Sequence, residues 1–318
     1  MKKWICVSIL LIVLGLAAVF GALLATDFDL AALDTKKYDT VTYDITDAFA
    51  GITVKGNTAR IELVPADEAA ARVVCSERER EKYTVTVREN TLVVELVDER
   101  KWYEHIAFFS FGEKKVTVQL PRDTYEALHV ENSTGDVTVA AGLGFEDVYV
   151  ATSTGDVTLE AAVGGTARVT ASTGDVSVKN TALGALYVTT DTGEIRLDTV
   201  TVAGLVELKV DTGDVLLRTL SCHSLYTTGD TGECELSNVL AQDSIFITRG
   251  TGDVSLDACD AASLFIVTDT GDVEGTLCSD KHFVAKSDTG DVEVPQYTTG
   301  GLCEITTDTG DIELRVLQ

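Results

Sequence analysis

The residues with the most evident chemical potential are Asp-Thr-Gly triplets, because aspartic proteases place two carboxylates close enough to share a proton. The triplet overlaps a second motif, Thr-Gly-Asp/Glu, which occurs ten times in the 318 residues. In nine of these cases the residue before Thr is Ser or Asp. A protease uses two copies from two lobes, and here every copy carries a second acid directly after the glycine. The number of copies indicates a structural repeat rather than a protease.

Stacked copies of the motif would also place carboxylates in rows, and such rows can hold a metal ion. Paired strands lie about 4.8 Å apart, and Ca²⁺ takes roughly six to eight oxygen ligands. The candidate ligands are Asp214, Asp253, Asp269, Asp272, Asp288, Asp291, Asp308 and Asp311. The alternative is a solvated acidic edge in which Asp side chains cap backbone amides. The glycine-rich nonapeptide of calcium-binding β rolls is missing, which argues against a specific calcium site. We therefore expect no cofactor, with Ca²⁺ as the one candidate to test.

Parallel β helices also include polysaccharide lyases and hydrolases, which break their own regularity to gather charged side chains on one face. Here Arg249 stands where the other repeats carry a small or apolar residue, and it is the clearest departure. The four His residues are scattered, and none lies at triad or metal-ligand spacing from a Ser or Cys. We therefore expect no catalytic residues and no enzymatic activity, with a polysaccharide-active enzyme as the more distant alternative.

The glycines of the motif recur every 19 or 20 residues. Each is expected to adopt a positive φ angle in a tight turn, which glycine does without steric cost. The ten turn-forming glycines are Gly135, Gly155, Gly174, Gly193, Gly213, Gly232, Gly252, Gly271, Gly290 and Gly310.

The residues on both sides of each turn alternate between apolar and polar, which is the pattern of a strand with one buried face. One repeat cannot bury its apolar face alone, whereas stacked repeats can, if each strand pairs in parallel with its equivalent one coil away. The sequence therefore predicts an all-β protein, with a parallel β-solenoid or β-helix of about ten coils over residues 122–318. A two-sheet sandwich is disfavoured because it does not require identical turns at a constant interval.

The N-terminus carries Lys2 and Lys3, followed by an uncharged run from Trp4 to Ala25. As a helix this run would span about 33 Å, close to the roughly 30 Å of a bilayer core. Positive charge before it and acidic residues after it predict a single-pass cell-membrane protein with a cytoplasmic N-terminus and an extracytoplasmic C-terminal domain. Residues 1–25 would be the cytoplasmic tip and anchor, and residues 26–39 a linker. A cleaved signal peptide is the alternative.

Residues 40–121 alternate apolar and polar side chains without the motif, and we expect an irregular β section that caps the first coil. Within it, an aromatic segment either plugs that coil or binds a partner. The aromatic residues concerned are Trp102, Tyr103, Phe108, Phe109 and Phe111. At the other end the chain stops directly after a strand, so the C-terminal coil would be an open edge through which the protein could self-associate.

Two further features concern chemistry and partners. Cys259 and Cys278 occupy the same column of adjacent repeats, so they could form a disulfide or remain buried thiols. The formal net charge of −26 repels phosphates, which excludes nucleic acid as a partner. The same charge suits cations, basic partners or simple solubility.

The repeated Ser/Asp-Thr-Gly-Asp-Val turns, led in by Lys-Val-Thr-Val-Gln-Leu-Pro at residues 115–121, resemble a bacterial putative-adhesin domain family of unknown function. The resemblance covers residues 40–318. It implies a β-solenoid, often behind one transmembrane helix, and surface attachment, but it transfers no catalytic or ligand residue. We therefore expect a membrane-anchored, non-catalytic protein that binds a protein or glycan surface. A structural or envelope-stress accessory role without a ligand is the alternative.

Overall fold

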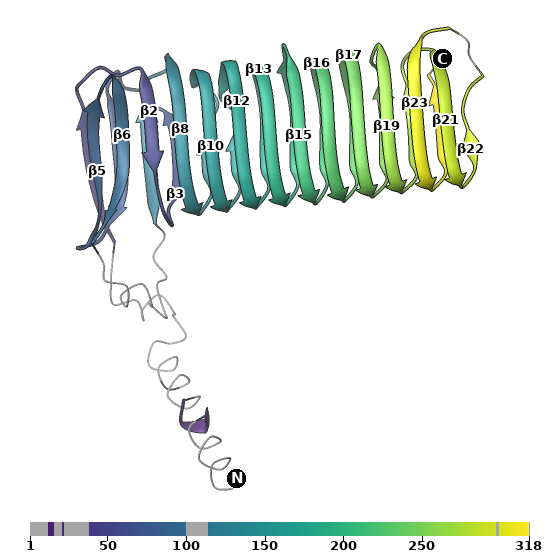
Figure 1. The fold of residues 1–318 in the computed structure, drawn as a ribbon. Helices are drawn as coiled ribbons and strands as arrows, with labels where there is room; N and C mark the ends of the chain where they lie inside the picture. Colours follow the sequence, from purple (N-terminus) through teal and green to yellow (C-terminus); the bar gives the residue numbers. More distant parts are fainter. Residues whose placement is uncertain (1–11, 16–20, 22–37, 100–113, 297–298, 318) are drawn as a thin grey trace.

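The computed structural model describes residues 12–15, 21, 38–99, 114–296 and 299–317. Its strands form an elongated parallel β-solenoid of about nine turns, with the coils stacked side by side along its length (Figure 1). The predicted all-β solenoid is therefore confirmed. The second strand of the outermost coil, β22, is short and spans only Val292–Glu293. The number of turns is slightly lower than the ten coils expected.

The strands fall into two groups. Those before the repeats are β1 (Asp39–Ile45), β2 (Gly51–Lys55), β3 (Arg60–Pro65), β4 (Ala71–Glu77), β5 (Glu81–Arg88), β6 (Thr91–Asp98) and β7 (Lys115–Leu120). Those of the repeats are β8 (Thr124–Thr134), β9 (Val137–Val139), β10 (Gly144–Thr154), β11 (Val157–Leu159), β12 (Ala162–Thr173), β13 (Val176–Thr192), β14 (Ile195–Val202), β15 (Leu205–Thr212), β16 (Val215–Thr231), β17 (Cys234–Thr251), β18 (Val254–Cys259), β19 (Ser263–Thr270), β20 (Val273–Leu277), β21 (Lys281–Thr289), β22, β23 (Gly301–Thr309) and β24 (Ile312–Val316).

The tight corner of each coil is built on a motif glycine. The φ angles of these glycines run from +111° at Gly135 to +154° at Gly271, a region that glycine enters without steric cost. A methyl group on Gly155 would lie 2.5 Å from the carbonyl oxygen of Gly135 in the neighbouring coil. Glycine is thus required twice, by the backbone angle and by the close approach of adjacent coils.

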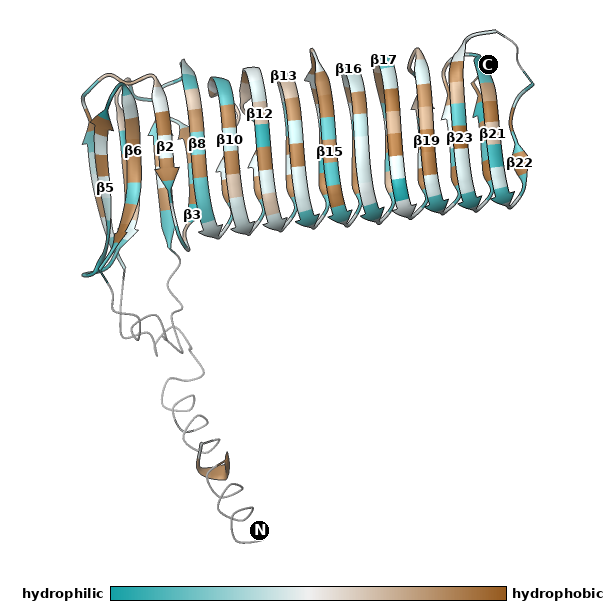
Figure 2. Cartoon of the chain, in the orientation of Figure 1, coloured by the Kyte–Doolittle hydropathy of each residue, from teal (hydrophilic) through white to brown (hydrophobic). Residues whose placement is uncertain are grey.

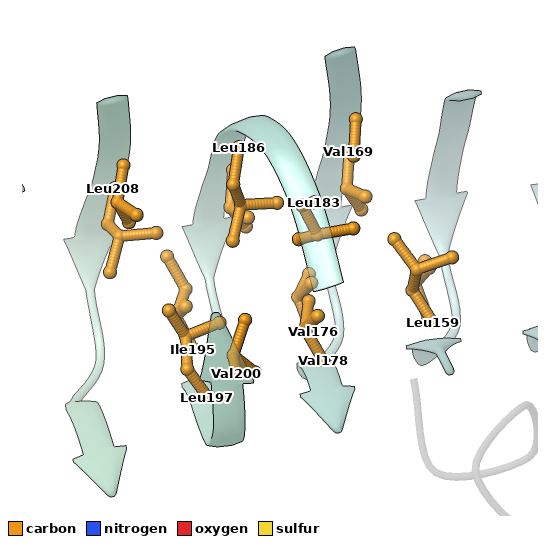
Figure 3. Packing of buried hydrophobic residues seen from close by; sticks show 14 of the residues in the cluster. Leu159, Val169, Val176, Val178, Leu183, Leu186, Ile195, Leu197, Val200 and Leu208 are labelled. Carbon is orange, nitrogen blue, oxygen red and sulfur yellow. The ribbon is translucent and has the colours of Figure 1, made fainter. Parts of the chain in front are cut away.

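The apolar columns of the repeat face one another inside the solenoid (Figure 3). Leu186, Ile195 and Leu208 have no exposed surface, and apolar bands alternate with polar ones along the strands (Figure 2). Fully burying an aliphatic side chain of this size contributes about 1.5–3 kcal/mol. A continuous core of this kind holds the coils together, since no single coil could bury its own face.

The N-terminal section continues the stack, but out of sequence order. Strand β2 pairs in parallel with β6 on one side and β8 on the other, and β3 lies in the same way between β7 and β9. Beyond them the pairing becomes antiparallel, with β5 on β6, β4 on β7 and β1 on β4. Among the described strands, β5 and β1 each pair on one side only and are the edge strands of this end.

The C-terminal coil is also out of order, and the expectation that it forms the open end is wrong. Strand β23 pairs in parallel with β19 and with β21, and β24 lies between β20 and β22. The Gly290 coil is therefore outermost, and the C-terminal coil is inserted beneath it. Across the inserted strand, Lys281 Nζ of β21 reaches Asp260 Oδ1 at the corner before β19, at 2.5 Å.

Two predicted features lie outside the described residues. One is the aromatic segment with Trp102, Tyr103, Phe108, Phe109 and Phe111, and the other is most of the run from Trp4 to Ala25. Residues 12–15 and 21 of that run are helical. In the part of the chain that the structure describes, no helix is long and apolar enough to cross a membrane.

Candidate functional site: an outward aromatic ladder

The acids after the motif glycines do form a row, but most of their carboxylates are already engaged. Asp156 Oδ1 accepts a hydrogen bond from the backbone N–H of Asp175 in the next coil at 2.9 Å. The other bonds of this kind join Asp136 to Asp156, Asp175 to Glu194, Asp214 to Glu233, Asp253 to Asp272, Asp272 to Asp311 and Asp311 to Asp291. Each bond satisfies one backbone N–H at the turn, so these carboxylates have a structural role in stabilising the turns.

The candidate calcium ligands are not brought together as a site. Within the described ranges, no group of three or more His, Cys, Asp or Glu side chains is arranged to hold a metal ion. Of the predicted ligands, Asp214, Asp253, Asp272 and Asp311 accept the backbone bonds described above, and Asp291 ends that row. The acids two positions before the glycine, Asp269, Asp288 and Asp308, are exposed, and Asp288 pairs with Lys286 Nζ at 2.6 Å. Calcium binding stays a prediction.

The two cysteines expected in one column face different environments. The strand register shifts after Leu256, so Leu277 rather than Cys278 pairs with Cys259. Cys259 is buried, Cys278 is exposed, and both are free thiols. Burial raises the pKa of Cys259 to about 11 and that of Cys222 to about 12. At neutral pH these buried thiols are protonated and pack as small apolar groups.

Arg249 is a second departure from the repeat, and it is only 1% exposed within the core. Its Nη2 donates to Thr227 Oγ1 at 3.3 Å, while Nε and Nη1 have no hydrogen-bond partner among the residues described. Gly229 of the adjacent coil leaves the space that the guanidinium occupies. Burial raises the pKa of the Cys234 thiol, so this neighbour carries no negative charge at neutral pH. The site is closed to solvent, and it is a structural peculiarity rather than a reaction centre.

An outward row of aromatic rings is the surface feature that the sequence analysis missed. Tyr226 on β16, Phe246 on β17 and Phe265 on β19 pair in register on adjacent coils. Their ring centroids are 4.7 Å and 4.5 Å apart, with interplanar angles of 12° and 8°. We call these three residues the aromatic ladder. Tyr226 is 39% exposed, and Val267 on the same face of β19 is 44% exposed.

The row continues beyond the aromatic ladder in other forms. His129 stacks on Tyr149 at 4.7 Å, and the Arg168 guanidinium carbon lies 4.5 Å from the centroid of the Tyr187 ring. Acidic residues border the aromatic ladder on both sides, because Glu207 pairs in register with Tyr226 and Glu304 with Phe265. Since the rings stack face to face, they cover one another's faces and present their edges to solvent.

A signal for the aromatic ladder was present in the sequence. Tyr226, Phe246 and Phe265 each lie six residues before a motif glycine, the same position in three successive repeats. Alternation of apolar and polar residues assigns such positions to the solvent side, where an aromatic ring has no packing role in the core. A column of rings at solvent-facing positions therefore points to stacking between coils and to a surface for a partner.

Comparisons with known proteins identify the fold family. The Toastrack DUF4097 family matches residues 49–219 and 204–318. A search of curated proteins finds no significant match to the sequence.

Solved structures resemble the fold at low sequence identity. A protein of Parabacteroides distasonis described as a putative adhesin is 14% identical, with a TM-score of 0.52, over 76% of this chain and 98% of that one. A putative adhesin of Bacteroides fragilis is 14% identical, with a TM-score of 0.43, over 87% and 97%. A putative lipid binding protein of Parabacteroides distasonis is 16% identical, with a TM-score of 0.47, over 74% and 94%. At such identity the first of these shows the fold alone.

Proposed function

Because the chain belongs to the Toastrack DUF4097 family and shares its fold with a protein described as a putative adhesin, we propose that it is a non-catalytic surface-binding protein. We further propose that the run from Trp4 to Ala25 anchors it in the cell membrane, with the solenoid outside the cytoplasm. The length of the run and the lysines before it support this orientation.

The aromatic ladder is the observation that carries the proposal. Aromatic residues are enriched at the centre of protein interfaces, and charged residues are depleted there. Here Tyr226 and Val267 are exposed and Phe246 and Phe265 are half-buried. Together they form an apolar strip between Glu207 and Glu304 on a chain of net charge −26. A protein surface with an apolar centre and a basic rim fits this strip. A glycan fits less well, because sugar rings pack on aromatic faces and these faces are covered.

The proposal is tested by attachment of the full chain, held in lipid nanodiscs, to a panel of bacterial and animal cells. We expect saturable attachment that protease treatment of the cells abolishes. A triple variant, Tyr226→Thr with Phe246→Thr and Phe265→Thr, should lower attachment at least tenfold while it keeps β-forming residues at the positions. The matched control is Tyr149→Thr, on the same face outside the aromatic ladder, which should leave attachment unchanged.

Other results would point to the alternatives. Attachment that a glycosidase abolishes, rather than a protease, would make the partner a glycan. An absence of saturable attachment would favour the structural or envelope role. Release of reducing sugar from a polysaccharide would make the protein an enzyme and overturn the proposal.

A further inference from the structure

The two ends of the solenoid differ in how they are finished. At the N-terminal end the antiparallel strands β4 and β5 cover the last parallel strands. At the other end β21 pairs only with β23, and β22 only with β24, among the described strands. Figure 1 shows β21 and β22 at the opposite end of the stack from β5 and β6. Both ends therefore have edge strands among the described residues: β1 and β5 in antiparallel pairs at one end, and β21 and β22 in parallel pairs at the other.

The core of the solenoid is also uncovered at this open end. Val292 is 44% exposed, and Phe283, Ala285 and Val294 are partly buried, whereas residues in the same columns of interior coils have almost no exposed surface. Val284, on the outer face of β21, is 47% exposed. An exposed strand edge beside apolar surface is a template for pairing with another strand.

We propose that this end binds a second copy of the chain, with β21 pairing antiparallel to β21 of that copy across a two-fold axis. In an antiparallel pair, residues opposite each other must face the same side of the sheet, so the axis must pass through a residue. For a nine-residue strand from Lys281 to Thr289, pairing along the whole strand requires that this residue is Ala285. The register is therefore fixed by geometry before any side chain is considered.

The side chains fit that register. With the axis at Ala285, His282 faces Asp288 of the second copy, and the symmetry repeats this pair on the other side. Val284 faces Lys286, so its apolar surface meets the aliphatic stem of the lysine. Phe283 faces Ser287 on the core side, and no two like charges lie opposite each other. An imidazole and a carboxylate opposite each other can form a hydrogen bond beside the pair that Asp288 makes with Lys286 of its own strand, while like charges directly opposite each other oppose pairing.

In this arrangement, one partner of the proposed surface-binding protein is a second copy of the chain. In a head-to-head pair the two solenoids form one rod, with the N-terminal sections at its far ends. If the run from Trp4 to Ala25 anchors each copy, the rod spans two facing membranes, and this bridging role rests on the proposed function. One coil cross-section is a small interface, below the roughly 1,200 Å² of stable complexes. Each contact is therefore weak, and many parallel contacts between two surfaces would supply the strength.

The test traps the contact with a disulfide. In the full chain with Cys6→Ser and Cys278→Ser, Ala285→Cys places a thiol on the two-fold axis, where the two Cα atoms would be about 4.5–5.5 Å apart, within disulfide range. We expect a disulfide-linked dimer on a non-reducing gel after mild oxidation, at least tenfold more than for Thr201→Cys, an exposed control on β14. His282→Asp should lower the yield several-fold, and His282→Asp with Asp288→His should restore it.

A yield for Ala285→Cys no greater than for Thr201→Cys would overturn the proposal. The proposal would also be overturned if His282→Asp with Asp288→His failed to restore the dimer. Cross-linking is measured without cells and attachment to cells uses the aromatic ladder, so the two proposals fail separately. Loss of the dimer with attachment intact removes only the end interface.

Discussion

At the scale of single residues, the departures from the repeat are more informative than the repeat itself. Arg249 brings a guanidinium into a core of aliphatic side chains, where two of its nitrogen atoms lack a described partner. Unpaired buried polar groups each cost about 1–3 kcal/mol. Thr227 and Gly229 accommodate the side chain without neutralising its charge. The core therefore tolerates Arg249 rather than gaining stability from it.

We predict that Arg249→Met raises the free energy of unfolding by about 1–4 kcal/mol, because a buried charge is replaced by an apolar side chain of similar length. Urea denaturation measures the change. The matched control is Arg218→Met at an exposed position, which should change stability by less than about 0.5 kcal/mol. A large loss of stability in Arg249→Met would show that the guanidinium has a strong partner in the folded protein.

The row of acids after the glycines contains a second testable detail. Asp214 Oδ1 accepts the backbone N–H of Glu233 at 2.8 Å, but among the described contacts Glu233 makes no such bond to Asp253. We attribute the difference to the additional methylene of the Glu side chain. Glu233→Asp should add this bond and stabilise the protein by about 0.5–1.5 kcal/mol. The reverse change, Asp214→Glu, should destabilise it by a similar amount, and a shift in the same direction for both variants would contradict the explanation.

At the scale of elements, each end of the solenoid contains a coil that is stacked out of sequence order. The C-terminal strands β23 and β24 each have a parallel partner on both sides. A chain terminus normally frays because little holds it. Here the terminus cannot leave without breaking two ladders at once, so the insertion secures the end of the repeat.

Native-state hydrogen exchange tests this arrangement. We predict that the backbone amides of β23 exchange more slowly than those of β21, because β23 is flanked on both sides and β21 on one. If the coils were stacked in sequence order, β23 would be the outermost strand and its amides would exchange faster. The measurement on the full chain therefore distinguishes the two orders without any substitution.

At the scale of the whole molecule, the charge of −26 is spread along a rod. Neighbouring carboxylates about 4.8 Å apart repel each other by roughly 1 kcal/mol in water before screening by salt. Such a charge repels phosphates and attracts basic groups. The apolar strip at the aromatic ladder and the open end at β21 interrupt this acidic surface. We propose that the strip binds another protein and that the open end binds a second copy of the chain.

Titration with divalent cations tests the acidic rows. Since the carboxylates of Asp214, Asp253 and Asp272 already accept backbone N–H groups, we predict that Ca²⁺ and Mg²⁺ raise the Tm equally, by screening alone. A selective rise of several degrees with Ca²⁺ would show a specific metal site. It would also favour attachment that depends on Ca²⁺.

The sequence alone determined the repeat and its fold. A glycine every 19 or 20 residues, flanked by alternating apolar and polar positions, allows few structures other than stacked parallel coils. The same pattern correctly placed the tight turns and the core columns, because backbone angle and burial depend on local residue types. It also predicted that the acids could be capping groups, which their hydrogen bonds show for most of that row.

Only the tertiary structure decided the order of the coils and the character of the surface. Each coil has nearly the same register, so the sequence cannot tell whether the Gly310 coil stacks on the Gly290 coil or beneath it. The connections between coils and contacts such as Lys281 with Asp260 settle that order. Likewise, Cys278 faces solvent because of a register shift that no repeat count reveals. Tyr226, Phe246 and Phe265 become one surface because parallel pairing brings residues 19 or 20 positions apart into contact.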